Sequence, residues 1–196
     1  MTATTTEAAG TETREEWLTR AVEALRPLFA EAGEDIPAVR VSVGFPGGGS
    51  ARKRIGECWA PGASVDGVPQ LFVSPVIGSR VQALDVLTHE LIHAIDRCES
   101  GHKGRFVKIA KAVGLEGKMT ATVASPALEE KLTEIGKALG DYPHSAITLA
   151  AATEKKQTTR MLKVECPEDG YTIRTTAKWL EVGLPVCPCG TEMVAV

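Results

Sequence analysis

The chain has 196 residues, of which 43% are hydrophobic, enough for one principal domain with its own core and a small appendage. Its formal net charge of −3 excludes a strong overall attraction to nucleic acid or to anionic membranes. No run approaches the roughly 18 apolar residues of a membrane span, and the N-terminus lacks the basic start and apolar core of a signal peptide. Because the five cysteines are an odd number, with three near the C-terminus, thiols or metal ligands inside a cell are favoured over a secreted disulfide framework. We therefore expect a cytoplasmic protein.

The first helix is expected shortly after the N-terminus. Residues 1–12 are mostly Thr, Ala, Glu and Gly and are predicted to be disordered, because they offer little apolar surface to bury. Thr13 and Glu16 have the spacing of a capping box. Apolar residues then recur at helical spacing from Trp17 to Phe29. Pro27 is expected to kink or split this helix.

Three short strands are predicted next, at residues 39–43, 55–60 and 70–74. The last of them directly precedes the helix that carries the main motif of the chain. A peptide can bind to such a strand by pairing as an added strand. Residues 70–74 are therefore the candidate for substrate pairing, with ordinary sheet packing as the alternative.

The main motif is His-Glu-Leu-Ile-His over residues 89–93, within a predicted helix that begins at a Ser79/Gln82 capping box. On a helix, His89 and His93 lie about 40° apart on one face, so both imidazoles can reach one zinc ion. Glu90 is placed to act as the general base on a water molecule that the ion activates. The spacing is the H-E-x-x-H signature of zinc metallopeptidases. The alternative is a set of polar residues on a solvated face, which the surrounding apolar residues disfavour.

The third ligand is predicted to be His102, because a catalytic zinc usually has three protein ligands. Gly101 lets the chain reverse, and His102 then opens a second helical pattern that ends at Gly114. The alternative is a surface histidine that caps the second helix. Asp96 lies one turn after the motif and could orient a ligand histidine, or it could be an exposed carboxylate.

A third helix is predicted from Ser125 and Pro126 to Gly140. Tyr142 and His144 follow it, and either could stabilise the oxyanion of a tetrahedral intermediate if it lies near the zinc. An ordered loop residue is the alternative. Residues 146–160 have the composition of a linker.

The C-terminal segment contains three cysteines with nearly the spacing of two zinc knuckles. Cys166 is followed by Asp169 where a second cysteine would stand, and Cys187 and Cys189 are one residue closer than usual. Either Asp169 supplies the fourth ligand of a structural zinc, or the module has lost its ion and is held by apolar packing of Tyr171, Ile173, Trp179 and Leu184. Arg174, Lys178 and Trp179 would suit a nucleic-acid surface, although residues 154–196 contain as many acidic as basic side chains.

The residues of the motif together with the run Gly-His-Lys-Gly-Arg-Phe over 101–106 resemble the SprT-like (Spartan-type) zinc metallopeptidases. The chain is most similar to the small SprT-like proteins of actinobacteria and their phages, over roughly residues 36–145. The resemblance implies an α+β zincin core with one catalytic Zn²⁺, a C-terminal zinc-ribbon-like β module, and a protease that acts on proteins near DNA. In a phage-encoded protein the compartment would be the host cytoplasm.

The predicted organisation is a catalytic domain at residues 13–145, a linker at 146–160 and a ribbon-like module at 161–196. The predicted activity is peptide-bond hydrolysis, with Glu90 as catalytic base and His89, His93 and His102 as metal ligands. The expected partners are a protein or peptide substrate and, through the tail, DNA. The alternative function is nucleic-acid binding by the tail, with the zincin core as a scaffold.

Overall fold

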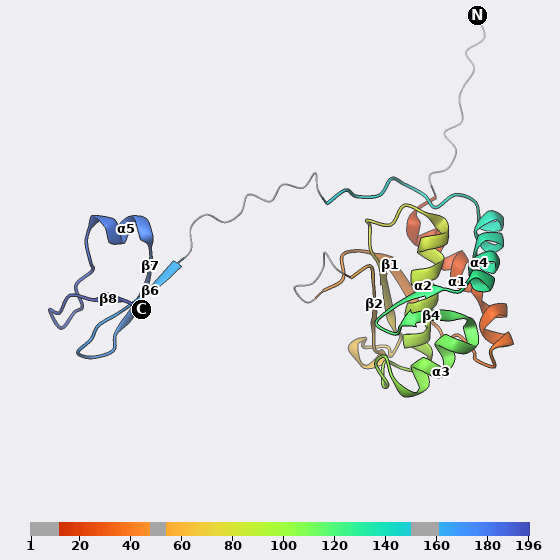
Figure 1. Ribbon diagram of the computed structural model, residues 1–196, viewed down its shortest axis with the longest axis horizontal. Helices are drawn as coiled ribbons and strands as arrows, with labels where there is room; N and C mark the ends of the chain where they lie inside the picture. The colour runs from red at the N-terminus through yellow and green to blue at the C-terminus, as the bar shows by residue number, and fades with distance from the viewer. Residues whose placement is uncertain (1–11, 48–53, 150–160) are drawn as a thin grey trace, which may run out of the picture. The chain divides into compact units, whose positions relative to one another are not determined.

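The computed structural model describes residues 12–47, 54–149 and 161–196, which form a mixed α+β architecture with five α-helices and three small sheets (Figure 1). The chain divides between Leu149 and Ala150 into two compact units. The predictions of disorder at the N-terminus and of a linker fall largely on residues 1–11 and 150–160, which lie outside the described residues. Within the described ranges, no helix has the length and apolar character needed to cross a membrane.

The first unit begins with helix α1 (Arg14–Glu31), and its capping box is confirmed. Glu16 donates its backbone N–H to the Thr13 hydroxyl at 3.2 Å, and the Glu16 carboxylate accepts from the Thr13 backbone N–H at 2.7 Å. The helix runs through Pro27 without a break, so the expected split does not occur. Pro27 and Glu23 both lie on the exposed side, where water can satisfy the carbonyl that loses its N–H partner.

The three predicted strands are confirmed as β1 (Arg40–Val43), β2 (Gly56–Trp59) and β3 (Gln70–Val73). They form one sheet in the order β1-β3-β2, with β1 parallel and β2 antiparallel to β3. Because β3 is the central strand, both of its edges are already paired. The prediction that residues 70–74 accept a substrate strand is therefore wrong, and β2 is the edge strand beside the motif helix in the described part of the chain.

The motif lies on α2 (Arg80–Ile95), which packs between the sheet and helix α4 (Pro126–Leu139) (Figure 1). Ser79 is the N-cap residue, but its side chain makes no capping hydrogen bond, so the predicted box with Gln82 does not form. Burial of the helix supplies its stability instead. The largest fully buried side chains of the core are Trp17, Leu18, Leu25, Phe29, Leu71, Ile77, Leu84, Leu87, Leu91, Ile92, Phe106 and Ile109.

The segment after α2 contains helix α3 (Gly104–Val113) and a hairpin of β4 (Leu115–Lys118) and β5 (Ala121–Ala124) that the sequence pattern did not predict. The predicted third helix is confirmed as α4, with the Ser125 hydroxyl accepting from the Leu128 backbone N–H at 3.3 Å. Residues 146–149, expected to be linker, belong to the first unit. The Ile147 backbone N–H donates to the Pro75 carbonyl at 2.9 Å.

The second unit is a three-stranded antiparallel sheet in the order β7-β6-β8, with one short helix. Its elements are β6 (Met161–Glu165), β7 (Thr172–Thr176), α5 (Ala177–Val182) and β8 (Val194–Ala195). In its described residues, 161–196, the buried cluster consists of Val164, Cys166, Cys187 and Met193. Modules with so small a core usually need a disulfide, a metal ion or oligomerisation for stability.

Candidate metal centres

Three histidine side chains converge on the solvent-accessible side of α2. The Nε2 atom of His102 lies 3.3 Å from Nε2 of His89 and 3.2 Å from Nε2 of His93. Nitrogens bound tetrahedrally to zinc at about 2.0–2.1 Å are about 3.3–3.4 Å apart. The three histidines therefore form a group that could hold a metal ion, and the structure brings together the three predicted ligands.

The turn between α2 and α3 carries His102 back over the other two histidines. Gly101 has a left-handed φ of 55°, which is the reversal that the sequence predicts there. The helix α3 begins only at Gly104, with Lys103 as its N-cap residue. His102 therefore lies in the turn before α3. The sequence pattern instead predicts it in the first turn of that helix.

Asp96 stabilises this turn and makes no hydrogen bond to the histidines, although its negative charge partly offsets the lowering of the His93 pKa by burial. It is the C-cap residue of α2 and is buried. Its carboxylate accepts from the Ser100 backbone N–H at 2.7 Å and from the Ser100 hydroxyl at 2.8 Å. The two hydrogen bonds from Ser100 replace the predicted one to a ligand histidine, because the Asp96 side chain folds over the turn that follows α2.

The hydrogen-bond partner of a histidine comes instead from the hairpin. The Nδ1 atom of His89 lies 2.8 Å from the Thr122 hydroxyl on β5. When Nδ1–H donates to that oxygen, the lone pair of His89 is on Nε2, where a metal would bind. The Phe106 ring packs against all three imidazoles, with centroid distances of 5.0 Å to His89, 4.4 Å to His93 and 5.1 Å to His102. This ring restricts their orientation.

Burial lowers the pKa of all three imidazoles, which favours their neutral form. It lowers the pKa of His89 to about 3, with further contributions from His93 and His102. It lowers the pKa of His93 to about 4 and also lowers that of His102. A neutral imidazole is the form that binds a metal, so the residues fit the ion that their arrangement implies.

Glu90 lies between α2 and the edge strand β2. A Cβ atom added to Gly56 would come within 2.4 Å of Oε1 of Glu90, so only glycine leaves room for the carboxylate. Glu90 is buried, and burial raises its pKa to about 8, with Cys98 and Glu57 adding to the shift. The sequence does not reveal this use of Gly56, because the glycine stands in an ordinary strand pattern.

Tyr142 and His144, the predicted oxyanion residues, contact the start of α1. The Tyr142 ring packs edge-on against Trp17, with centroids 5.0 Å apart, and the guanidinium of Arg14 lies 4.6 Å above it. The carbonyl of His144 accepts from Arg14 Nη2 at 3.2 Å. Among the described residues, no hydrogen bond or ring contact joins either side chain to the three histidines. Their surroundings indicate a structural role, and neither side chain is assigned as an oxyanion donor.

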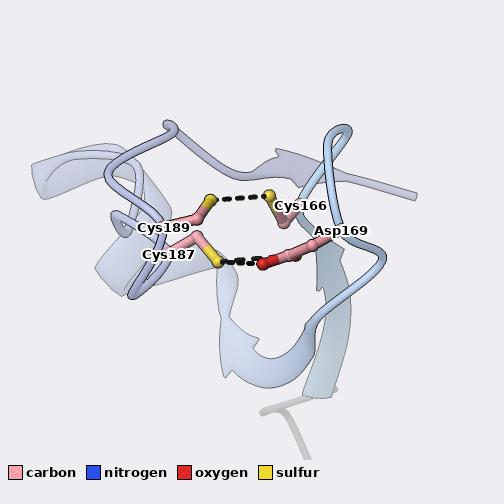
Figure 2. Close-up of side chains that lie close together, drawn as sticks. All are labelled: Cys166, Asp169, Cys187 and Cys189. Atoms are coloured by element: carbon pink, nitrogen blue, oxygen red, sulfur yellow. Dashed lines mark hydrogen bonds between the residues drawn. The ribbon is translucent and has the colours of Figure 1, made fainter.

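The second group that could hold a metal ion is formed by Cys166, Asp169, Cys187 and Cys189. Figure 2 shows their side chains directed towards one another, with Sγ of Cys166 3.6 Å from Sγ of Cys189. Sγ of Cys187 lies 3.3 Å from Oδ2 of Asp169. Sulfurs bound to one zinc at about 2.3 Å are about 3.7–3.8 Å apart. The predicted fourth ligand, Asp169, belongs to this group.

Two turns hold these four residues in place. The Gly170 backbone N–H donates to the Cys166 carbonyl at 3.1 Å, and the Gly190 N–H donates to the Cys187 carbonyl at 2.8 Å. Both glycines have left-handed φ angles, 74° and 90°, as such tight turns require. The Tyr171 N–H donates to Oδ1 of Asp169 at 3.0 Å and lowers the pKa of that carboxylate.

The alternative of a metal-free module held by apolar packing disagrees with the exposure of its aromatic residues. Tyr171 is 50% exposed, Trp179 is 59% exposed and Leu184 is 40% exposed. Of the four residues expected to replace the ion, only Ile173 packs against the small buried cluster. Tyr171, Trp179 and Leu184 therefore contribute little to the packing of this module.

A substitution of Asp169 tests this second site. We expect Asp169→Ala to weaken binding of the second zinc by more than the roughly 10–100-fold that follows loss of an outer hydrogen-bond partner, and Asp169→Cys to preserve it. Zinc titration followed by native mass spectrometry measures the stoichiometry, and the second unit's NMR spectrum reports its folding. Glu168→Ala, one residue away, is the matched control. Equal zinc content in Asp169→Ala and wild type would remove Asp169 from the ligand set.

Sequence reasoning missed two residues of the first site, Thr122 and Gly56. The alternating Ala-Thr-Val-Ala run of β5 is a strand signal that could have indicated the hairpin, but not its contact with His89. Comparison of the chain with models of protein families, with curated proteins and with solved structures gave no match.

Proposed function

We propose that the protein is a zinc-dependent metallopeptidase that hydrolyses peptide bonds, with one catalytic zinc on His89, His93 and His102. The observation that carries the proposal is the convergence of three imidazole nitrogens, with the buried carboxylate of Glu90 directly after His89 on α2. Three protein ligands leave one position open, which is typical of catalytic zinc and not of structural zinc. The H-E-x-x-H spacing supports the same assignment.

The residues of the chain divide the work between binding and proton transfer. A bound zinc ion supplies Lewis acidity towards a carbonyl oxygen and lowers the pKa of water to about 7. Burial raises the pKa of Glu90 to about 8, so at and above that pH its carboxylate is ionised. In this form it accepts the proton of the attacking water and then donates it to the nitrogen of the leaving amine. Thr122 and Phe106 hold the histidine rings in the required orientation.

The substrate is proposed to bind as an extended strand along β2. This strand is at the edge of the sheet in the described part of the chain, and it flanks Glu90 through Gly56. Pairing to an edge strand supplies affinity through main-chain hydrogen bonds, which suits a peptidase that accepts varied side chains.

Metal removal tests the activity. We expect the zinc-loaded protein to cleave an unfolded test protein such as casein, to lose this activity with 1,10-phenanthroline and to regain it with added zinc. The peptide products are measured by mass spectrometry. We expect circular dichroism to show that the first unit stays folded without metal, because its large apolar core does not depend on the ion. Cleavage that persists in the fully metal-free protein would contradict the proposal.

The SprT-like resemblance supports a narrower substrate class, namely proteins that are bound or cross-linked to DNA. This part rests on family analogy. It also supports the assignment of the second unit as a zinc-ribbon-like module with a structural zinc on Cys166, Asp169, Cys187 and Cys189.

Nucleic-acid binding by the second unit is the alternative function. Tyr171 and Trp179 are largely exposed, and the ammonium group of Lys178 lies 5.3 Å from the Trp179 ring centroid. Exposed aromatic rings next to cationic side chains are the surface on which single-stranded bases stack. Residues 150–196 contain six acidic and six basic side chains, so the unit has no net positive charge to attract phosphates.

Truncation separates the two functions. We expect a chain ending at residue 149 to fold, bind one zinc and keep its activity on casein, but to bind DNA less tightly than the full chain does. Fluorescence anisotropy at several salt concentrations measures the affinity, which falls as salt rises when phosphates are contacted. The double variant Arg174→Ala/Lys178→Ala should reproduce much of the loss, while Lys108→Ala/Lys111→Ala on α3 should not. Equal affinity of both chain lengths at low salt would refute a DNA-binding role for the second unit.

A further inference from the structure

Two cysteines outside both metal groups lie side by side in the first unit. Cys58 is on the edge strand β2, and Cys98 follows the C-terminal end of α2. Their Sγ atoms are 3.4 Å apart, and Sγ of Cys98 is 3.7 Å from the Cys58 carbonyl oxygen. Both side chains are half-buried free thiols. A small oxidant can therefore reach a pair of sulfurs that are already in contact.

The backbone on both sides holds this contact in place. Cys58 pairs with Leu71 in the sheet, and the Cys98 backbone N–H donates to the His93 carbonyl at 2.8 Å. Arg97 and Cys98 both have left-handed φ angles, 56° and 58°, which non-glycine residues rarely adopt. The chain keeps this uncommon conformation at the residue whose thiol contacts Cys58.

A metal ion does not explain the pair. Within the described ranges, the groups of three or more ligand residues are the histidine cluster and the Cys166 cluster, and neither includes Cys58 or Cys98. A structural zinc is normally closed by four protein ligands. Two thiols without further donors instead match the requirement of a disulfide, whose sulfurs are about 2.03–2.05 Å apart.

We propose that Cys58 and Cys98 are a redox modification site that forms a reversible disulfide with a hydroperoxide as oxidant. One thiolate attacks the peroxide oxygen, the O–O bond breaks, and a sulfenic acid and hydroxide (or an alkoxide) form. The second thiol then attacks the sulfenic sulfur, the S–S bond forms, and the hydroxyl leaves as water. Two thiols are oxidised, one peroxide is reduced, and a dithiol reverses the change by thiol–disulfide exchange.

The disulfide would join the edge strand to the end of the motif helix. Cys58 is two residues from Gly56, which contacts Glu90, and Cys98 lies in the turn that leads to His102. The bond closes a long chain segment between β2 and this turn, so it restricts the unfolded chain and stabilises the folded one. This inference depends only on the two thiols and stands whether or not the protein is a peptidase.

Peroxide treatment of the zinc-loaded full chain tests the proposal. After reaction with hydrogen peroxide and capping with N-ethylmaleimide, non-reducing digestion should yield a cross-linked peptide containing Cys58 and Cys98, which dithiothreitol removes. The melting temperature of the first unit should rise by roughly 5–10 °C and return after reduction. Cys58→Ser should abolish the rise and leave a sulfenic acid at Cys98 that dimedone captures, and Cys98→Ser should do the same for Cys58.

Two results would overturn the inference. One is capping of both thiols by N-ethylmaleimide at a peroxide concentration that oxidises the three C-terminal cysteines. The other is oxidation of Cys58 or Cys98 to a sulfinic acid, or its linkage to a C-terminal cysteine, in place of the mutual bond. The C-terminal cysteines are present in every variant and therefore serve as an internal reference for oxidant exposure.

Discussion

Glu90→Gln is expected to leave zinc bound and to abolish peptide hydrolysis. Glutamine is nearly isosteric, so it fits the space beside Gly56 that the carboxylate occupies. Its amide cannot accept a proton from water, and loss of a general base lowers the rate by about 10²–10⁴-fold. The measurement is kcat on casein together with zinc content for both proteins.

The matched control is Glu99→Gln, which makes the same chemical change at an exposed residue in the turn near the histidines. It should keep the wild-type rate. Turnover by Glu90→Gln at the wild-type rate would exclude Glu90 as the base, whereas loss of zinc from this variant would mean that the carboxylate positions the ligands.

His102→Ala is expected to remove the catalytic zinc. Its Nε2 atom lies within 3.3 Å of Nε2 of both His89 and His93, and two ligands on one helix do not complete a zinc site. The expected loss of affinity exceeds the roughly 10–100-fold effect of an outer partner. His89→Ala and His93→Ala should behave in the same way. Zinc stoichiometry would fall by one ion per chain, and activity would fall to background.

His144→Asn provides the control for these variants, because His144 is the one histidine outside the cluster and asparagine tolerates its φ of 63°. It should retain full zinc content. If His102→Ala retained full zinc occupancy and activity, the assignment of the third ligand would be wrong.

The sequence alone predicts much of what depends on neighbouring residues, although the Ser79/Gln82 box does not form. Helical geometry places His89 and His93 on one face at any position in the fold. The caps of α1 and α4 form as predicted, since a capping residue contacts backbone groups only two or three positions away. The knuckle-like spacing around Cys166 and Cys187 also indicates the second metal group, because short turns bring each pair of ligands together.

Contacts between distant segments were decided only by the tertiary structure. The partner of His89 is Thr122, 33 positions away, and no local pattern identifies such a pair. The central position of β3 depends on how three strands pair, so the substrate edge could not be assigned from chain order. Tyr142 follows α4 but packs at the start of α1, because burial of its ring against Trp17 is determined by how the helices pack together. Local geometry therefore determines the ligand motif, whereas long-range packing decides which groups surround it.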